Sequence, residues 1–232
     1  MIPFLIYTLL RKHVAQAWLK FGDQINRLRK NYLHLLIIGL LEIITIFYPL
    51  DSAGQSTQFQ YKVIFNGKNI GWLRLEKNIT GNKLNLLLTS EITTKIIFPI
   101  TVFTKEFSTF ENGKLVYSSL IRKTNGKTKE DTQIKLNGDV YEVLKNGARE
   151  KLPDPLINNN LLGLFFKEPI ALKSVFCDKK QCYIKVSKCQ DGGYETKFSR
   201  GNSNCFYYNK EGLCTKVKIE HLFYNAEIVF VH

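Results

Sequence analysis

Residues 59–75 read FQYKVIFNGKNIGWLRL, and this stretch decides the fold class. Its Asn66-Gly67 pair is the dipeptide that adopts positive φ at both central positions of a type I′ turn with least strain. Before the turn, Tyr61, Val63 and Phe65 fall on one face of an extended chain while Lys62 falls on the other. The stretch therefore predicts an antiparallel hairpin with one apolar face.

The same turn signal recurs downstream. Asn-Gly occurs five times, and glycine turns at Gly81, Gly192 and Gly212 add to it. Turns spaced about 8–12 residues apart, with hardly any long helical pattern, are typical of a meander. We therefore predict an all-β domain over 55–232, a curved antiparallel meander, barrel-like or a β-roll, of about ten strands. The clearest predicted strands are 59–65, 71–77, 83–90, 103–110, 114–123, 131–136 and 139–145.

One segment interrupts the strand pattern. Pro153 and Pro155 suit an entry turn, and Pro169 prevents a helix from continuing. Between them, residues 156–166 predict one short helix. An apolar helix in a meander usually plugs the open end of the sheet by core packing; a mobile lid over a ligand cavity is the alternative.

The first 54 residues differ in kind from the rest and form a predicted helical leader. An apolar run over 35–50 follows Arg27, Arg29 and Lys30 and precedes the small residues Ser52, Ala53 and Gly54. A basic region, an apolar region and a small-residue exit are the parts of a signal peptide. We expect a cleaved signal peptide, with a signal anchor or a buried core helix as alternatives; the run is short for a membrane span and carries Glu42.

Several short motifs carry a family resemblance. They are Asn66-Gly-Lys-Asn-Ile-Gly-Trp-Leu73, Phe110-Glu-Asn-Gly-Lys-Leu115, Lys123-Thr-Asn-Gly-Lys127, Leu164-Phe-Phe-Lys-Glu-Pro169 and Phe206-Tyr-Tyr-Asn-Lys-Glu-Gly-Leu-Cys214. With them, the chain from Tyr61 onward resembles the domain-of-unknown-function families of secreted, β-rich proteins found in Bacteroidota. The resemblance implies an exported envelope protein and carries no assigned activity. The long leader departs from that pattern, which favours a start placed too far upstream.

All five cysteines fall in the last quarter of the chain. In an oxidising compartment such clustering predicts one or two disulfides, and the odd count leaves a free thiol. Cys177 with Cys182 is the first candidate pair, because the four residues between them suit a tight turn; Cys189 with Cys205 is the second. Unpaired structural cysteines are the alternative, and zinc is disfavoured because no C-x-x-C pair and no nearby His exist.

No catalytic, cofactor-binding or metal-binding residue is predicted. After the leader, His221 and His232 are the histidines that remain, and Glu220 beside His221 on a strand points to the opposite face. No G-x-S-x-G, H-E-x-x-H or phosphate-loop pattern appears. Histidine-based catalysis is therefore not expected.

The positive charge needs its own interpretation. The chain has 33 Lys and Arg against 20 Asp and Glu, a formal charge of +13. Removing the six basic and three acidic residues of 1–53 leaves +10. The lysines recur singly along strands and beside turns, and Arg is scarce, whereas nucleic-acid sites cluster Arg and Lys with aromatics. We expect a solvated face, or an anionic envelope partner such as a lipid or an acidic glycan, and no nucleic acid.

The sequence as a whole favours an exported, non-catalytic binding or structural domain. The predicted location is the periplasm or the outer membrane's inner face, with an uncleaved inner-membrane anchor as alternative and transient membrane targeting through 35–50. A sheet curved around an apolar interior could hold a lipid or another amphiphile. The alternative is a carboxylate-based enzyme acting on an envelope glycan. An integral outer-membrane barrel is disfavoured, because several strands are too short and lysines would occupy the lipid face.

Overall fold

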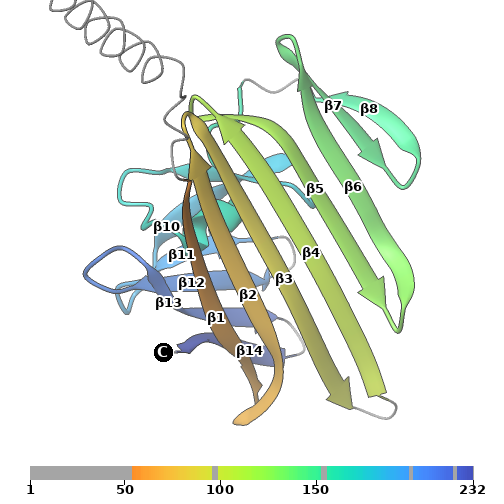
Figure 1. Cartoon of the computed structure of the whole chain (residues 1–232). Helices are drawn as coiled ribbons and strands as arrows, with labels where there is room; N and C mark the ends of the chain where they lie inside the picture. Colours follow the sequence, from red (N-terminus) through yellow and green to blue (C-terminus); the bar gives the residue numbers. More distant parts are fainter. Residues whose placement is uncertain (1–53, 96–98, 153–155, 199–200, 222–223, 232) are drawn as a thin grey trace, which may run out of the picture. The chain divides into compact units, whose positions relative to one another are not determined.

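Fourteen antiparallel strands form one continuous sheet in the part of the chain that the structure describes (Figure 1). The structure is a computed structural model, and it describes residues 54–95, 99–152, 156–198, 201–221 and 224–231. The strands are β1 (Gln55–Phe65), β2 (Lys68–Thr80), β3 (Lys83–Lys95), β4 (Pro99–Glu111), β5 (Lys114–Thr124), β6 (Lys127–Asn137), β7 (Val140–Lys145), β8 (Ala148–Leu152), β9 (Ser174–Cys177), β10 (Cys182–Lys188), β11 (Tyr194–Lys197), β12 (Ser203–Tyr208), β13 (Cys214–His221) and β14 (Tyr224–Val231).

Asn-Gly turns set most of the hairpins between β1 and β8. Asn66, Asn112, Asn125 and Asn146 have φ between +47° and +51°, and the glycine after each also has positive φ. That is the geometry of a type I′ turn, whose twist matches the twist of the flanking strands. At the fifth pair the glycine, Gly138, has φ of +62°, and its Asn is not left-handed. The predicted hairpin pattern is confirmed.

The first and last strands of the chain, β1 and β14, are neighbours in the middle of the curved sheet, and β8 and β9 form its edges. β1 pairs antiparallel with β14, so that Tyr61 lies opposite Phe230 and Val63 lies opposite Ile228. The strand order runs from β8 through β1 to β14 and on to β9. Among the described strands no pairing joins β8 to β9. The predicted curved antiparallel meander is therefore present, and it is barrel-like without being closed.

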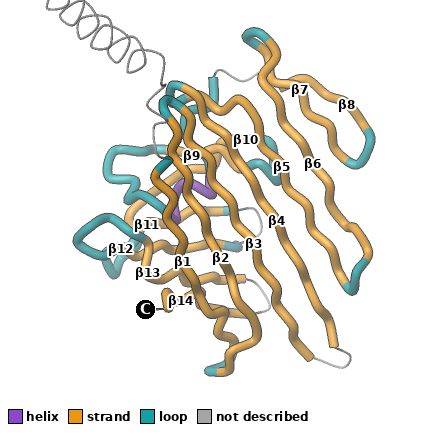
Figure 2. The backbone as a smooth tube through the Cα atoms, in the orientation of Figure 1, coloured by secondary structure: helices purple, strands orange, loops and turns teal. Residues whose placement is uncertain are grey.

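A short helix plugs the concave side of the sheet. It is the 3-10 helix η1 (Leu161–Phe165), which contacts β3 and β9 and lies behind β1 and β2 in Figure 2. Leu162, Leu164 and Phe165 are its buried residues. The helix predicted over 156–166 is thus present but shorter and tighter, because Asn160, with an extended backbone, caps its start.

Tyrosine hydroxyls, one buried at Tyr141 and one half-buried at Tyr208, connect the plug and the core to the sheet. Tyr141 Oη donates to the Leu115 carbonyl at 2.8 Å and accepts from the Ile157 amide at 3.1 Å. Tyr208 Oη donates to the Leu164 carbonyl of η1 at 2.7 Å. The hydroxyls of Tyr141 and Tyr208 therefore both have partners, which avoids the cost of leaving a buried polar group unpaired.

The chain divides into two compact units, Met1–Asp51 and Ser52–His232. Every described strand and the entire described core belong to the second unit, which therefore has what a domain needs to fold by itself. The predicted helical leader lies outside the described residues. None of the described helices is long and apolar enough to span a membrane.

The described part of the chain has fourteen strands, whereas the sequence predicts about ten. β9 and β11 have four residues each, and all three residues from Val175 to Cys177 are buried. Strands this short show no readable alternation, because two or three inward positions do not establish a period.

Candidate functional site

One pocket, here called the apolar pocket, lies between the start of β3, the end of β4 and residues 158–172. Its volume is about 570 Å³. Leu84 and Leu86 face it from alternate positions of β3, and Phe110 lies directly opposite Leu84 in the β3–β4 register. Leu164, Phe166 and Leu172 complete its apolar wall from the other side. A volume of this size is typical of small-molecule sites.

Polar side chains are confined to part of the lining of the apolar pocket. They are Lys77, Asn82, Asn158, Asn159, Asn160, Lys167 and Glu168. Lys77 is half-buried on β2, in line with the inward-facing Leu73 and Leu75, whereas Lys167 is exposed. The pocket therefore combines an apolar wall with ammonium groups.

A second pocket, the polar pocket, has a volume of about 430 Å³. Charged groups of both signs line it, together with two aromatic rings and two amides: Glu106, Arg122, Asp178, Lys179, Lys180, Glu220, His221, Phe198, Tyr224, Asn202 and Asn204. Strands β4, β5 and β13 and the turn after β9 supply most of these residues. This pocket is the place where ionisable groups meet inside the fold.

Asn160 connects the two pockets. It is 1% exposed, lines the apolar pocket, and donates from Nδ2 to Ser108 Oγ at 2.7 Å and to Asp178 Oδ2 at 3.1 Å. Its Oδ1 accepts from the Gly163 amide at 3.2 Å and so caps η1. One amide side chain thereby fixes both the plug and a carboxylate of the polar pocket.

Two carboxyl groups in the polar pocket have shifted pKa values. Burial, followed by the nearby Asp178 carboxylate, raises the pKa of Glu106 from 4.5 to about 7. Burial also raises the pKa of Asp178, while hydrogen bonding from Ser118 and Asn160 opposes that shift. Shifted carboxyl groups in a cleft mark a functional-site candidate, because acid–base chemistry needs such values.

The Asp178 environment retains unused hydrogen-bonding capacity. Ser118 Oγ and Asp178 Oδ1 are both buried, and neither makes a hydrogen bond of standard geometry within the described part of the chain. The Ser118 hydroxyl is nevertheless close enough to lower the pKa of Asp178. Lys179 Nζ lies 3.9 Å from Glu130 Oε2, so a further ion pair borders the cluster.

Comparison with known proteins identifies a family. The family described as a domain of unknown function, DUF6134, matches residues 61–231. The chain belongs to the DUF6134 family. No curated protein matches it. Among solved structures, it resembles the crystal structure of a beta-barrel-like protein of domain of unknown function DUF1849 from Brucella abortus, at 8% identity and a TM-score of 0.49, covering 75% of this chain and 94% of that one. The expected β-rich domain of unknown function is confirmed.

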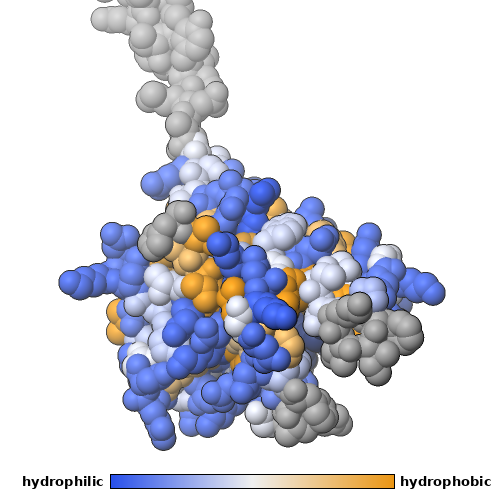
Figure 3. Space-filling model, turned by 90° about the horizontal axis from the view of Figure 1, so that it is seen from below, coloured by the Kyte–Doolittle hydropathy of each residue, from blue (hydrophilic) through white to orange (hydrophobic). Residues whose placement is uncertain are grey.

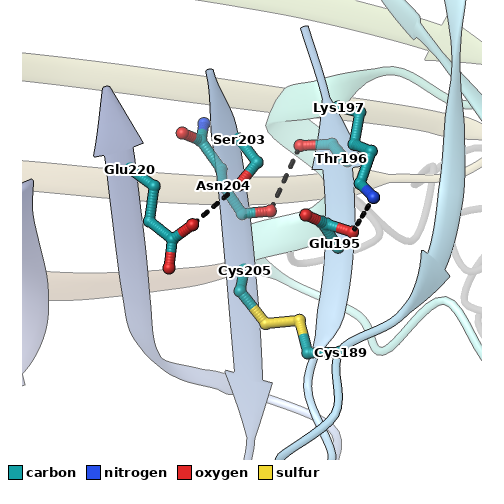
Figure 4. Close-up of polar contacts among 8 residues, drawn as sticks. All are labelled: Cys189, Glu195, Thr196, Lys197, Ser203, Asn204, Cys205 and Glu220. Atoms are coloured by element: carbon teal, nitrogen blue, oxygen red, sulfur yellow. Dashed lines mark hydrogen bonds and ion pairs between the residues drawn. A yellow bond between two sulfur atoms is a disulfide. The ribbon is translucent and has the colours of Figure 1, made fainter. Parts of the chain in front are cut away.

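The DUF6134 domain contains one disulfide among its described cysteines, between Cys189 and Cys205, with a Cα–Cα distance of 6.6 Å (Figure 4). This is the second of the two predicted pairs. Cys177 and Cys182, the first predicted pair, are free thiols. They lie opposite each other in the β9–β10 register, but Cys177 is buried in the core while Cys182 is exposed, so their thiols occupy different environments. The first predicted pair is therefore not bonded in this structure.

The remaining buried thiols of the DUF6134 domain are poor nucleophiles. Burial raises the pKa of Cys177 to about 11 and that of Cys214 to about 12. In the described chain, Cys189, Asp191 and Cys205 form a group with metal-ligand spacing. The two sulfurs are bonded to each other, and Asp191 Oδ2 accepts from Lys218 Nζ and Tyr207 Oη at 2.7 Å each. Each of the three potential ligands therefore already has a partner, so the cluster does not suit a metal ion.

Glu220 and His221, which are adjacent in the sequence, lie at the end of β13 in the DUF6134 domain. Glu220 Oε2 accepts from Ser203 Oγ at 3.4 Å (Figure 4), while the His221 ring stacks on Tyr224 with centroids 4.6 Å apart. The two side chains thus have separate partners.

Seen from the end with the β1–β2 turn, hydrophilic residues are spread over the surface and hydrophobic ones gather towards its middle (Figure 3).

Proposed function

We propose that this domain is a non-catalytic binding protein of the cell envelope that holds an anionic amphiphile in the apolar pocket. The observation that carries the proposal is a pocket of about 570 Å³ with an aliphatic and aromatic wall and lysines in its lining. Pockets of a few hundred Å³ that are mainly apolar, with a few placed polar groups, are the usual form of small-molecule sites.

The wall favours a hydrocarbon chain over a polar ligand. Leu86 and Leu164 are each 2% exposed and Phe110 is 5% exposed, so the pocket's inner wall is part of the hydrophobic core. Phe166 packs against Phe59 of β1 with ring centroids 6.1 Å apart, which gives that side of the wall a fixed position. Each methylene placed against this wall contributes about 0.8 kcal/mol.

The charged lining favours an anionic headgroup. Lys77 comes from the sheet and Lys167 from the segment after η1, so two ammonium groups from separate elements border the same pocket. Glu168 is the acidic residue of the pocket lining. A carboxylate or phosphate near the two lysines would gain charge-assisted hydrogen bonds.

Two observations support export. The Cys189–Cys205 disulfide suits an oxidising compartment such as the periplasm. The apolar run 35–50, preceded by basic and followed by small residues, suits a signal peptide. We therefore propose a periplasmic or outer-membrane-associated location, with an inner-membrane anchor as the alternative.

A paired substitution tests the binding function. Leu84 lines the apolar pocket. Leu87 is on the same strand, but its side chain points to the opposite face of the sheet and lines none of the described pockets. We expect Leu84→Asp to weaken binding of a fluorescent long-chain fatty acid at least tenfold, about 1.4 kcal/mol, and Leu87→Asp to leave it unchanged. Absence of binding by the unmodified protein would contradict the proposal.

The carboxyl pair of the polar pocket favours a second candidate function, hydrolysis of an envelope glycan. Glu106, with a pKa of about 7, would donate a proton to the leaving glycosidic oxygen. Asp178 would take a proton from the attacking water as the bond to the sugar carbon breaks. Loss of glycan hydrolysis in Glu106→Gln, with binding of the fatty acid retained, would support this function. Absence of hydrolysis by the unmodified protein on acidic and neutral cell-wall glycans would exclude it.

A further inference from the structure

We propose that residues 167–173, here called the portal loop, dock the domain on an anionic lipid bilayer at the mouth of the apolar pocket. This proposal rests on the proposed function, because a docked bilayer would be the source of the amphiphile that enters the apolar pocket. The occupant of this surface is a bilayer and not another protein. Ile170, Lys167 and Lys173 are the residues that we expect to contact lipid.

Ile170 is the most exposed large hydrophobic residue in the described part of the chain. Its side chain is 78% exposed, whereas the next, Tyr224, is 47% exposed. Ala171 beside it is also exposed. Exposing a full isoleucine to water gives up roughly 1.5–3 kcal/mol that burial would return. Insertion into the interface of a bilayer would recover much of this free energy.

The portal loop is held in place, so the exposure of Ile170 is built into the fold. The Glu168 amide donates to the Gly212 carbonyl at 3.0 Å, which ties the loop to the turn before β13. The amides of Ile170 and Leu172 donate within the loop, to the carbonyls of Glu168 and Pro169. Pro169 is buried and Leu172 is half-buried, so both neighbours anchor the loop while Ile170 points outward.

The charges around Ile170 complement an anionic surface. Lys167 and Lys173 flank it in sequence and are both exposed. Glu168 is the acidic residue within the portal loop, and it is half-buried. Each Lys near an anionic bilayer contributes about 1 kcal/mol of attraction. An apolar apex flanked by lysines is the pattern of interfacial membrane contacts, whereas a protein-binding patch of a standard interface needs a far larger area.

The portal loop and the apolar pocket share residues. All six residues from Lys167 to Leu172 line the pocket, so an amphiphile leaving a bilayer at Ile170 would reach the pocket directly. The chain enters the domain at the same end: a Cβ at Gly54 would lie within 3.1 Å of Asn78 Oδ1, one residue from Lys77. In the sequence, three residues separate the apolar run 35–50 from Gly54, the first described residue.

Vesicle co-sedimentation of the unit Ser52–His232 tests the proposal. We expect binding to vesicles of phosphatidylglycerol mixed with phosphatidylcholine, and much weaker binding to pure phosphatidylcholine. Ile170→Glu should weaken binding about tenfold or more, from the lost apolar insertion. Val140→Glu is the matched control, because Val140 is 41% exposed and lines none of the described pockets. The double variant Lys167→Glu, Lys173→Glu should also lose about tenfold or more.

Two further readouts separate this proposal from the proposed function. In solution, Lys173→Glu, at a portal-loop residue outside the lining of the apolar pocket, should still bind the fluorescent fatty acid while its binding to anionic vesicles weakens. Leu84→Asp should lose the fatty acid and keep vesicle binding. In the full chain, anionic vesicles should slow hydrogen exchange of the Ile170 and Leu172 amides. Equal vesicle binding by Ile170→Glu and the unmodified unit, or unchanged exchange at these amides, would overturn the docking proposal.

Discussion

Asn160 holds Asp178 through a hydrogen bond of 3.1 Å from its Nδ2 to the carboxylate, and so joins the plug of the curved sheet to the polar pocket. The same amide lines the apolar pocket and caps η1. The Asn160 side chain thus lies between the apolar pocket and the carboxyl pair of the polar pocket, and it contacts both.

Asn160→Ala should strongly destabilise the domain. The substitution removes the cap of η1 and leaves Ser108 and Asp178 with one donor fewer. We expect a loss of about 2–4 kcal/mol from these combined effects, measured by urea unfolding. Asn158→Ala is the matched control, because Asn158 is exposed and should change stability by less than about 0.5 kcal/mol. Similar effects at both positions would argue against the assigned role.

Glu106 should make the stability of the domain depend on pH. Its pKa is about 7 in the folded state against 4.5 ordinarily, so the folded protein binds this proton more tightly than the unfolded chain. The free energy of unfolding should therefore fall as pH rises from about 4.5 to 7 and then level off, and the raised pKa of Asp178 acts in the same direction.

Glu106→Gln should remove most of that dependence. At pH 8 the variant should be more stable than the unmodified protein by about 1–3 kcal/mol, because no charge has to be buried. At pH 4.5 the difference should shrink. Urea unfolding at the two pH values measures this, and an unchanged slope in the variant would show that Glu106 is not the titrating group.

Gly71 should not tolerate a side chain. A Cβ at this position would overlap the Glu91 carbonyl oxygen and lie 2.8 Å from Ile92 Cα, and both are backbone atoms that hold the β2–β3 register. We expect Gly71→Ala to cost more than about 3 kcal/mol or to prevent folding. Gly163→Ala is the control, since its Cβ would lie 3.7 Å from the nearest atom, Asn160 Oδ1. Thermal unfolding of both variants gives the comparison, and equal melting temperatures would contradict it.

Removing the disulfide should destabilise the C-terminal strands. Replacing Cys189 and Cys205 by Ala opens a loop with a sequence separation of 16, which should cost about 3 kcal/mol. Reductant should lower the stability of the unmodified protein by a similar amount and leave the double variant unchanged. If reductant had no effect on the unmodified protein, the cross-link would not contribute to its stability.

The hairpins could be predicted from the sequence, because a type I′ turn is a local property of two residues. Asn66 and Asn112, each followed by glycine, have the left-handed φ that the dipeptide predicts. The pairing of β1 with β14 could not, since it joins Tyr61 to Phe230 across almost the whole domain. Nothing local specifies such a partner.

The candidate sites could not be predicted from the sequence either, because they too join residues that are far apart along the chain. Glu106 on β4 and Asp178 after β9 meet only because the sheet curls around η1, and neither carries a local motif. The cysteine pairing was open in the sequence for a related reason: the sequence spacing that favoured Cys177 with Cys182 says nothing of which thiol is buried. The sequence predicts that the residues of the apolar wall are part of a hydrophobic core, but it does not predict that they line an open pocket.

The most direct test of the binding function is photo-crosslinking of the full chain with a fatty acid that carries a diazirine at the end of its chain, followed by peptide mapping. The apolar pocket predicts crosslinks to Leu84, Leu86, Phe110 and Leu164, which should disappear in Leu84→Asp and persist in Leu87→Asp. Crosslinks confined to residues outside this pocket, or equal labelling of the pocket in both variants, would contradict the account.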